Sequence, residues 1–113
     1  MSKILICSKE EGMRETMKLA LEDHYGLIVC AEIDQAIDVI NHAPSIKSFF
    51  IDIDQMDNVD KTISDIKKSN PKLRITAISN SKGQDKAKEV VRNGADGFII
   101  KPIRTEELLS ICK

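Results

Sequence analysis

Three polar or charged side chains each end or follow a short aliphatic run of the sequence. Asp52 ends one run, Ser79 ends a second, and Lys101 follows a third. Groups at the ends of apolar strands lie where parallel-sheet folds bind their ligands. A carboxylate at the end of an aliphatic run also needs a polar partner, because it is costly to bury without one. These residues are candidates for one site if the fold brings them together.

The runs that carry these residues belong to a set of five. Each is rich in Ile, Val, Phe or Leu at consecutive positions, so that both faces of an extended strand would be apolar. Strands buried on both faces are typical of parallel sheets covered by helices. The sequence therefore predicts five strands, over residues Lys3–Cys7, Leu27–Ala31, Ser48–Ile53, Arg74–Ser79 and Gly97–Ile100.

Segments with helical periodicity lie between and after these strands. Apolar residues recur in them at intervals of three and four, which places each set on one face of a helix. The five predicted faces consist of Met13, Met17, Ala20, Leu21 and His24; Ile33, Ala36, Ile37 and Ile40; Val59, Thr62, Ile63 and Ile66; Ala87, Val90 and Val91; and Leu108, Leu109 and Cys112.

The uninterrupted alternation of strand and helix predicts a doubly wound (βα)5 fold of the α/β class. Because the crossovers must be right-handed, we expect a flavodoxin-like parallel sheet in the order 2-1-3-4-5. Ligands of such folds bind at the carboxyl ends of the strands, beside the point where the strand order reverses. The residues expected there are Ser8, Lys9, Glu10, Asp52, Ser79, Asn80, Lys101 and Pro102.

Residues typical of helix ends agree with these boundaries. Ser8 with Glu11 forms an S-x-x-E pattern, which predicts a capping box at the start of the first helix. Gly94 suits a left-handed C-cap, Pro71 separates a helix from the next strand, and Thr105 is a candidate N-cap of the last helix.

Composition limits the function classes. The 113 residues fit one domain, and a net charge of −1 gives no general attraction to nucleic acid or to an anionic membrane. The aliphatic runs are too short for a membrane span, and no secretory signal is present. The three cysteines, Cys7, Cys30 and Cys112, lack zinc spacing and indicate reduced thiols in a cytoplasm. His24 and His42 lack a nearby ligand set, which favours a structural role.

The whole chain resembles the receiver domains of two-component response regulators. The resemblance is strongest in Ile4–Ile6, in Phe49–Asp52 and in Gly94–Pro102. The last segment reads GADGFIIKP, close to the family pattern G-A-x-x-[YF]-[aliphatic]-x-K-P. The fold that the resemblance implies is the one predicted from the alternation of elements.

The resemblance also implies roles for individual residues. Asp52 would be the phosphoacceptor, Ser79 the hydroxyl that bonds the phosphoryl group, and Lys101 the family's lysine, followed by a cis-proline turn at Pro102. Phe98 would be the switch aromatic. We expect the surrounding pocket to include Ser8, Lys9, Glu10 and Asp54.

Two positions depart from the family pattern. The family holds Mg²⁺ mainly with two acids after the first strand, and here those positions are Ser8 and Lys9. A pocket of Asp52, Lys9 and Lys101 has a formal charge of +1, or zero if Glu10 turns inward. An ammonium group cannot ligate Mg²⁺. We therefore expect no metal site, and we expect Lys9 to pair with Asp52.

These features predict an atypical receiver that acts through protein contacts on its last two helices, with weak or no Mg²⁺-dependent phosphorylation. Its partners would be a sensor histidine kinase, an output domain or effector, or a second copy of the chain. The short last helix suggests a domain from a longer protein. The segment after Asp52 also lacks the family's proline, which weakens any assumption of ordinary switching.

Two alternatives remain open from the sequence. In the first, Asp52 is a working phosphoacceptor, and Glu10 restores Mg²⁺ binding. In the second, Cys7 is the nucleophile of a phosphatase or of a phosphotransferase-system IIB-like enzyme, because it precedes a loop that leads to Arg14. That loop holds two glutamates and one glycine, a poor cradle for an anion, and Cys7 falls on the strand itself.

Overall fold

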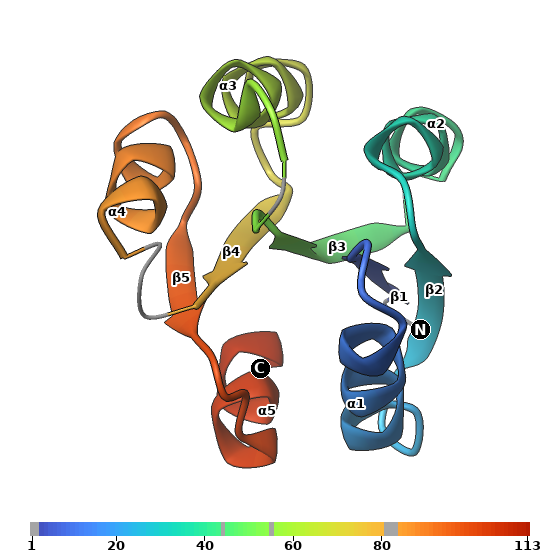
Figure 1. Cartoon of the computed structure of the whole chain (residues 1–113). Helices are drawn as coiled ribbons and strands as arrows, with labels where there is room; N and C mark the ends of the chain where they lie inside the picture. Colours follow the sequence, from blue (N-terminus) through green and yellow to red (C-terminus); the bar gives the residue numbers. More distant parts are fainter. Residues whose placement is uncertain (1–2, 44, 55, 81–83) are drawn as a thin grey trace.

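The computed structural model describes residues 3–43, 45–54, 56–80 and 84–113. Five parallel strands form one sheet in the order β2-β1-β3-β4-β5, which confirms the predicted topology (Figure 1). The strands are β1 (Lys3–Cys7), β2 (Gly26–Cys30), β3 (Ile46–Asp52), β4 (Arg74–Ser79) and β5 (Gly97–Ile100).

Five helices alternate with the strands and cover both faces of the sheet (Figure 1). Helices α2, α3 and α4 lie on one face, and α1 and α5 lie on the other. The helices are α1 (Glu11–Leu21), α2 (Ile33–His42), α3 (Val59–Ser69), α4 (Gln84–Arg92) and α5 (Thr105–Cys112).

The core has two layers because the strands are apolar on both faces. Phe49 of β3 belongs to the layer beneath α2, α3 and α4, whereas its neighbour Phe50 belongs to the layer beneath α1 and α5. Both side chains are fully buried. Successive residues of a strand point to opposite faces, so that β3 contributes to both layers.

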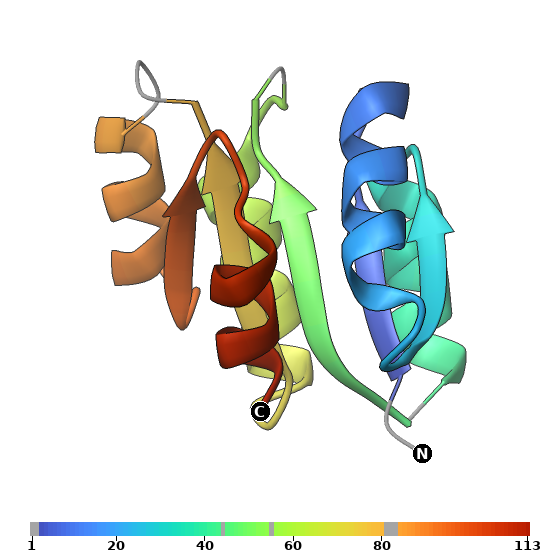
Figure 2. The ribbon, with the colours of Figure 1, turned by 90° about the horizontal axis from the view of Figure 1, so that it is seen from below.

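The strand ends that carry polar residues lie at one edge of the sheet. The paired strands are all parallel, and the arrows that are visible in Figure 2 point towards this edge. Strands β1 and β3 are neighbours at the point where the strand order reverses, and Cys7 pairs with Ile51 in their register. Asp52 in turn pairs with Ile78 of β4. The residues that follow these pairs are therefore close in space.

Some predicted boundaries were wrong by one or two residues. The second strand spans Gly26–Cys30 rather than Leu27–Ala31, and the third spans Ile46–Asp52 rather than Ser48–Ile53. These differences arise because hydrogen bonds to the neighbouring strands, rather than apolar composition, set where a ladder ends. His24 does not belong to the first helix face, since α1 ends at Leu21 and His24 is exposed in the following turn.

The predicted helix ends were confirmed in part. Gly94 follows α4 with a φ of 129°, a conformation that side chains rarely adopt, and Pro71 lies in the turn between α3 and β4. Thr105 is not an N-cap: the N-cap of α5 is Arg104, whose carbonyl accepts the hydrogen bond from Leu108.

Candidate functional site

Asp52 lies at the end of β3 with its side chain almost fully buried, at 2% exposure. Three donors surround its carboxylate. The Ser8 hydroxyl donates to Oδ2 at 2.7 Å, the Asp54 backbone amide donates to Oδ1 at 3.1 Å, and Lys101 Nζ lies 3.1 Å from Oδ2. The burial of this carboxylate is thus offset by charge and by hydrogen bonds.

Lys101 follows β5 and joins three carboxylates. Its ammonium lies 3.1 Å from Asp52, 2.9 Å from Asp54 and 3.7 Å from Glu10. Burial opposes the charged form of this lysine, but the hydrogen bonds and negative charges of Asp54 and Asp52 outweigh it and raise the pKa of Lys101 above its ordinary value. The Lys101–Pro102 peptide bond is cis, as the resemblance implied.

Ser8 does not form the predicted capping box with Glu11. Its hydroxyl is turned to Asp52 and also accepts a hydrogen bond from the Glu10 backbone amide at 3.1 Å. Helix α1 begins at Glu11, with Glu10 as an N-cap that makes no side-chain capping bond. The buried carboxylate therefore takes a hydroxyl that the local sequence would assign to the helix. A capping box forms instead at α2, between Glu32 and Gln35.

Lys9 was predicted to pair with Asp52, and the structure places the ammonium of Lys101 3.1 Å from the Asp52 carboxylate. Lys9 is exposed and lines a cavity of about 200 Å³ together with Ser8, Asp52 and Asp57. Ser8 bonds Asp52 from the β1 side, and Lys101, in the turn after β5, lies 3.1 Å from the same carboxylate oxygen.

The predicted formal charge of the pocket, +1 or zero with Glu10 turned inward, did not count Asp54. The structure brings Asp54 and Glu10 against Lys101, in addition to Asp52. Three carboxylates and the two ammonium groups of Lys9 and Lys101 give a formal charge of −1. Charge alone therefore does not oppose a cation here, and the decisive question is which groups already occupy the carboxylate oxygens.

Ser79 is fully buried at the end of β4 and reaches the same cluster through Asp54. Its hydroxyl donates to Asp54 Oδ1 at 3.1 Å, and the Asn80 backbone amide donates to Asp54 Oδ2 at 3.1 Å. Phe98 is half-buried in β5 and lines a surface hollow with Pro102. The structure thus brings Ser8, Glu10, Asp52, Asp54, Ser79 and Lys101 into one contact network, and it places Lys9 at the margin of that network.

The part played by Asp54 was not predicted from the sequence, although the residue was placed in the pocket. Asp54 accepts hydrogen bonds from both Ser79 and Lys101. A signal for this was present: side chains two positions apart in extended chain point to the same side, so that Asp54 follows Asp52 into the same cleft.

The sequence matches the family model of the response regulator receiver domain over residues 4–113. The chain belongs to this family. It is therefore a two-component signalling module, and receiver domains act through contacts with proteins such as kinases and effectors. In the described part of the chain, no helix has the length and apolar character needed to cross a membrane.

Solved structures agree with this assignment. The receiver domain of NtrX from Brucella abortus is 26% identical, with a TM-score of 0.86 over 96% of this chain and 93% of that chain. A longer NtrX chain from Brucella abortus, solved in complex with ADP, is also 26% identical, with a TM-score of 0.87. The match covers 99% of this chain but only 26% of that NtrX chain. A response regulator from Thermotoga maritima, at 21% identity and a TM-score of 0.85 over 99% of this chain and 94% of that one, shares the fold. A comparison with curated protein sequences gave no match.

The residues of this receiver do not fit the Mg²⁺ ion that the family uses. The hydroxyl of Ser8 and the ammonium of Lys101 already bond Asp52 Oδ2, and neither group of the Ser8-Lys9 pair offers a carboxylate. Across residues 3–43, 45–54, 56–80 and 84–113, no group of three or more His, Cys, Asp or Glu side chains is arranged to hold a metal ion.

Cys7 points into the core of the receiver rather than into a phosphate-binding loop. Its side chain is 4% exposed and packs in the layer beneath α2, α3 and α4. Burial is the main reason that the pKa of its thiol is raised to about 12, with further contributions from the neighbouring Cys30 and from negative charges. A nucleophilic cysteine needs the thiolate, which is scarce at neutral pH under these conditions.

We therefore expect that iodoacetamide does not alkylate Cys7 in the native protein at neutral pH. In denatured protein, Cys7 should be fully alkylated within the same time. Peptide mass spectrometry of both samples would measure this. Alkylation of Cys7 in the folded chain at the rate of a free thiol would contradict the burial of this side chain and favour the alternative in which Cys7 is a nucleophile.

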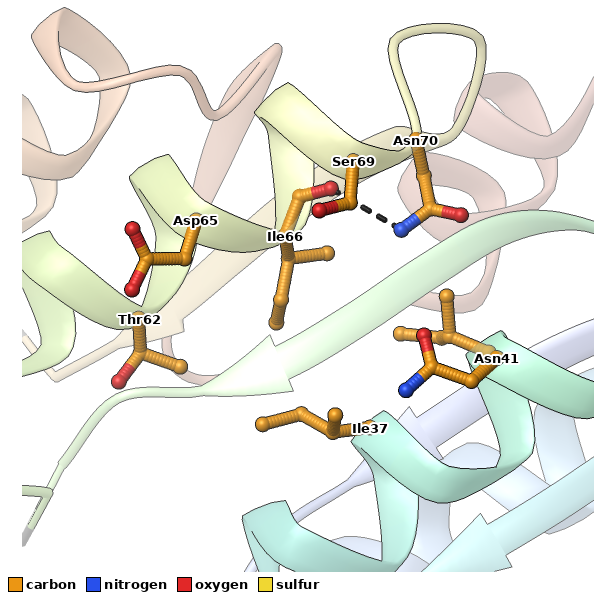
Figure 3. Close-up of a pocket in the computed structure, with 8 residues that line it drawn as sticks. Ile37, Asn41, Thr62, Asp65, Ile66, Ser69 and Asn70 are labelled. Atoms are coloured by element: carbon orange, nitrogen blue, oxygen red, sulfur yellow. Dashed lines mark hydrogen bonds between the residues drawn. The ribbon is translucent and has the colours of Figure 1, made fainter.

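Another hollow lies between α2 and α3, and none of the residues that contact Asp52, Asp54 or Lys101 lines it (Figure 3). It has a volume of about 210 Å³, and Ile37, Thr62, Ile66 and Asn70 are among its lining residues. The Asn70 side-chain amide is bonded to the Ile66 carbonyl at 3.1 Å, and Asp65 is paired with Lys61. Two of its polar side chains are thus bonded within the chain.

Proposed function

We propose that this receiver is atypical and acts as a protein interaction module, with weak or no Mg²⁺-dependent phosphorylation of Asp52. The observation that supports this most is the 2.7 Å hydrogen bond from the Ser8 hydroxyl to Asp52. Ser8 occupies a position at which the family has a metal-binding acid. Its hydroxyl donates a hydrogen bond to Asp52, the carboxylate that would have to receive the phosphoryl group. In this proposal Ser79 and Lys101 keep the ability to bind a phosphoryl group, and Phe98 is the switch aromatic.

The interaction surface would be formed by α4, β5 and α5, as in the family. Phe98 and Pro102 border a hollow of about 500 Å³ there, together with the charged side chains of Arg104, Glu106 and Glu107. A half-buried apolar centre with a charged rim is typical of a protein-binding surface. The partners would be a sensor histidine kinase, an output domain or effector, or a second copy of this chain, and the proposed compartment is the cytoplasm.

A second candidate function is an ordinary phosphoacceptor at Asp52, with Glu10 completing a cation site. The observation that favours it is that Glu10, Asp52 and Asp54 all meet at Lys101, which leaves the pocket with a formal charge of −1. In this alternative Mg²⁺ would share the Asp52 carboxylate with the Ser8 hydroxyl and the Lys101 ammonium, which both bond Oδ2.

Addition of millimolar Mg²⁺, alone and then with beryllofluoride, separates the two candidates. We expect the amide resonances of Asp52, Asp54 and Glu10 to stay in place, because the oxygens of Asp52 are already bonded within the chain. Amide NMR measures this directly. Saturable shifts at these residues with a millimolar or tighter Kd would favour the phosphoacceptor instead.

A further inference from the structure

The Asp54 carboxylate accepts hydrogen bonds from three donors of different kinds. These are the Ser79 hydroxyl at 3.1 Å, the Asn80 backbone amide at 3.1 Å and the Lys101 ammonium at 2.9 Å. A hydroxyl, an amide and an ammonium that converge on one anion form the type of donor set that binds carboxylate or phosphate groups. Two of the three, Ser79 and Lys101, are the groups that the proposed function assigns to a phosphoryl group.

The position of Asp54 is fixed by its own backbone. Its amide donates to Asp52 Oδ1 at 3.1 Å, which ties the residue to the end of β3 and holds both carboxylates beside Lys101. The Asp54 side chain is 14% exposed, against 2% for Asp52, and so it lies on the solvent side of the buried carboxylate. This is the side from which an incoming group would approach.

We propose that Asp54 is a built-in anionic ligand of the groups that would otherwise bind a phosphoryl group on Asp52. The inference rests on the proposed function, because that function assigns Ser79 and Lys101 to the phosphoryl group. A ligand tethered to the same chain has a high effective concentration and competes well with external anions. Asp54 thus keeps Ser79 and Lys101 in their anion-bound arrangement without any modification of the protein.

The proposal has a regulatory consequence. A phosphoryl group on Asp52 would need the donors that Asp54 holds, and its negative charge would lie next to a carboxylate. Asp54 therefore opposes phosphorylation of Asp52. It also stabilises the arrangement in which Ser79, at the end of β4, and Lys101, after β5, donate hydrogen bonds to a carboxylate. The module would then be held in one state rather than switched by phosphate.

Chemical rescue with sodium acetate tests this proposal. In Asp54→Ala the three donors lose their shared acceptor, and acetate should restore it. We expect acetate to produce saturable amide shifts at Ser79 and Asn80 in Asp54→Ala, and to move them back towards their wild-type positions. The wild-type protein should show no saturable shift. Neither should the control Asp57→Ala, which removes an exposed carboxylate that lines the cavity beside Asp52. Equal responses in all three proteins, or none in Asp54→Ala, would overturn the proposal.

A second variant keeps the test valid if Asp54→Ala does not fold. Asp54→Asn retains an acceptor oxygen but loses the charge, and neutral hydrogen bonds are roughly half as strong as charge-assisted ones. The Asn80 amide should exchange with solvent at least about threefold faster in Asp54→Asn than in the wild type. Unchanged exchange would overturn the proposal. The proposed function fails by a different result, namely saturable Mg²⁺ binding to the wild-type protein.

Discussion

Replacing Lys101 with methionine is expected to lower the free energy of unfolding by about 3 kcal/mol, the lower end of the cost of removing one partner from a buried ion pair. Methionine preserves most of the volume, so that the loss reflects charge. Without the ammonium, the buried Asp52 carboxylate would keep its bonds to Ser8 and to the Asp54 amide but would face Asp54 with no cation between them. Urea unfolding followed by circular dichroism would measure the change.

Two controls test the physical reason for this loss. Lys61→Met breaks the exposed pair with Asp65 and should cost less than about 0.5 kcal/mol. In a background of Asp52→Asn with Asp54→Asn, Lys101→Met should cost about 1 kcal/mol or less, because no unpaired carboxylate remains at those positions. If Lys101→Met lowers the free energy of unfolding by no more than Lys61→Met does, the ion pairs of Lys101 do not stabilise the fold.

The pH dependence of the Lys101 contribution follows from the direction of its pKa shift. The pKa of Lys101 is raised in the folded state, so that its contribution is fully present below the ordinary lysine pKa and is lost as pH rises through the raised value. The stability difference between the wild type and Lys101→Met should therefore be constant near neutral pH and shrink in strongly alkaline solution as Lys101 loses its proton.

Installing two acids after β1 is expected to create Mg²⁺ binding, which we do not expect of the wild type. In Ser8→Asp with Lys9→Asp, the formal charge of the pocket falls from −1 to −4, and the new carboxylate at position 8 lies beside Asp52 in place of the hydroxyl 2.7 Å away. Hard oxygen ligands at these positions suit Mg²⁺. Amide shifts at Asp52 and Asp54 during a Mg²⁺ titration should become saturable, with a millimolar or tighter Kd.

The matched control is Ser8→Asn with Lys9→Asn, which introduces side chains of the same shape without charge and should not bind Mg²⁺. The double aspartate variant should also be less stable than the wild type without metal, since like charges crowd Asp52, and should regain stability when Mg²⁺ is added. Failure of the aspartate variant to bind Mg²⁺ would show that the missing acids do not disable the site. The altered segment after Asp52 would then be the cause.

The architecture was predictable because it depends on patterns that are repeated along the chain. Residues such as Phe49 and Phe50 are buried on opposite faces of β3, which the consecutive apolar run indicated before any contact was known. The alternation of elements and the right-handed crossover rule then left one strand order. These regularities are averages over many residues, and an error of one or two residues in a boundary does not change them.

The composition of the site was also predictable, but its pairing was not. The sequence by itself determined that Asp52, Ser79 and Lys101 end neighbouring strands, because parallel strands present their carboxyl ends at one edge. Only the tertiary structure decided that Ser8 bonds Asp52 instead of capping α1, and that Lys101 joins Asp52, Asp54 and Glu10. The local sequence offered Ser8 another role at the start of α1, and the choice depends on burial: the carboxylate that loses its water has the most to gain from the available donors.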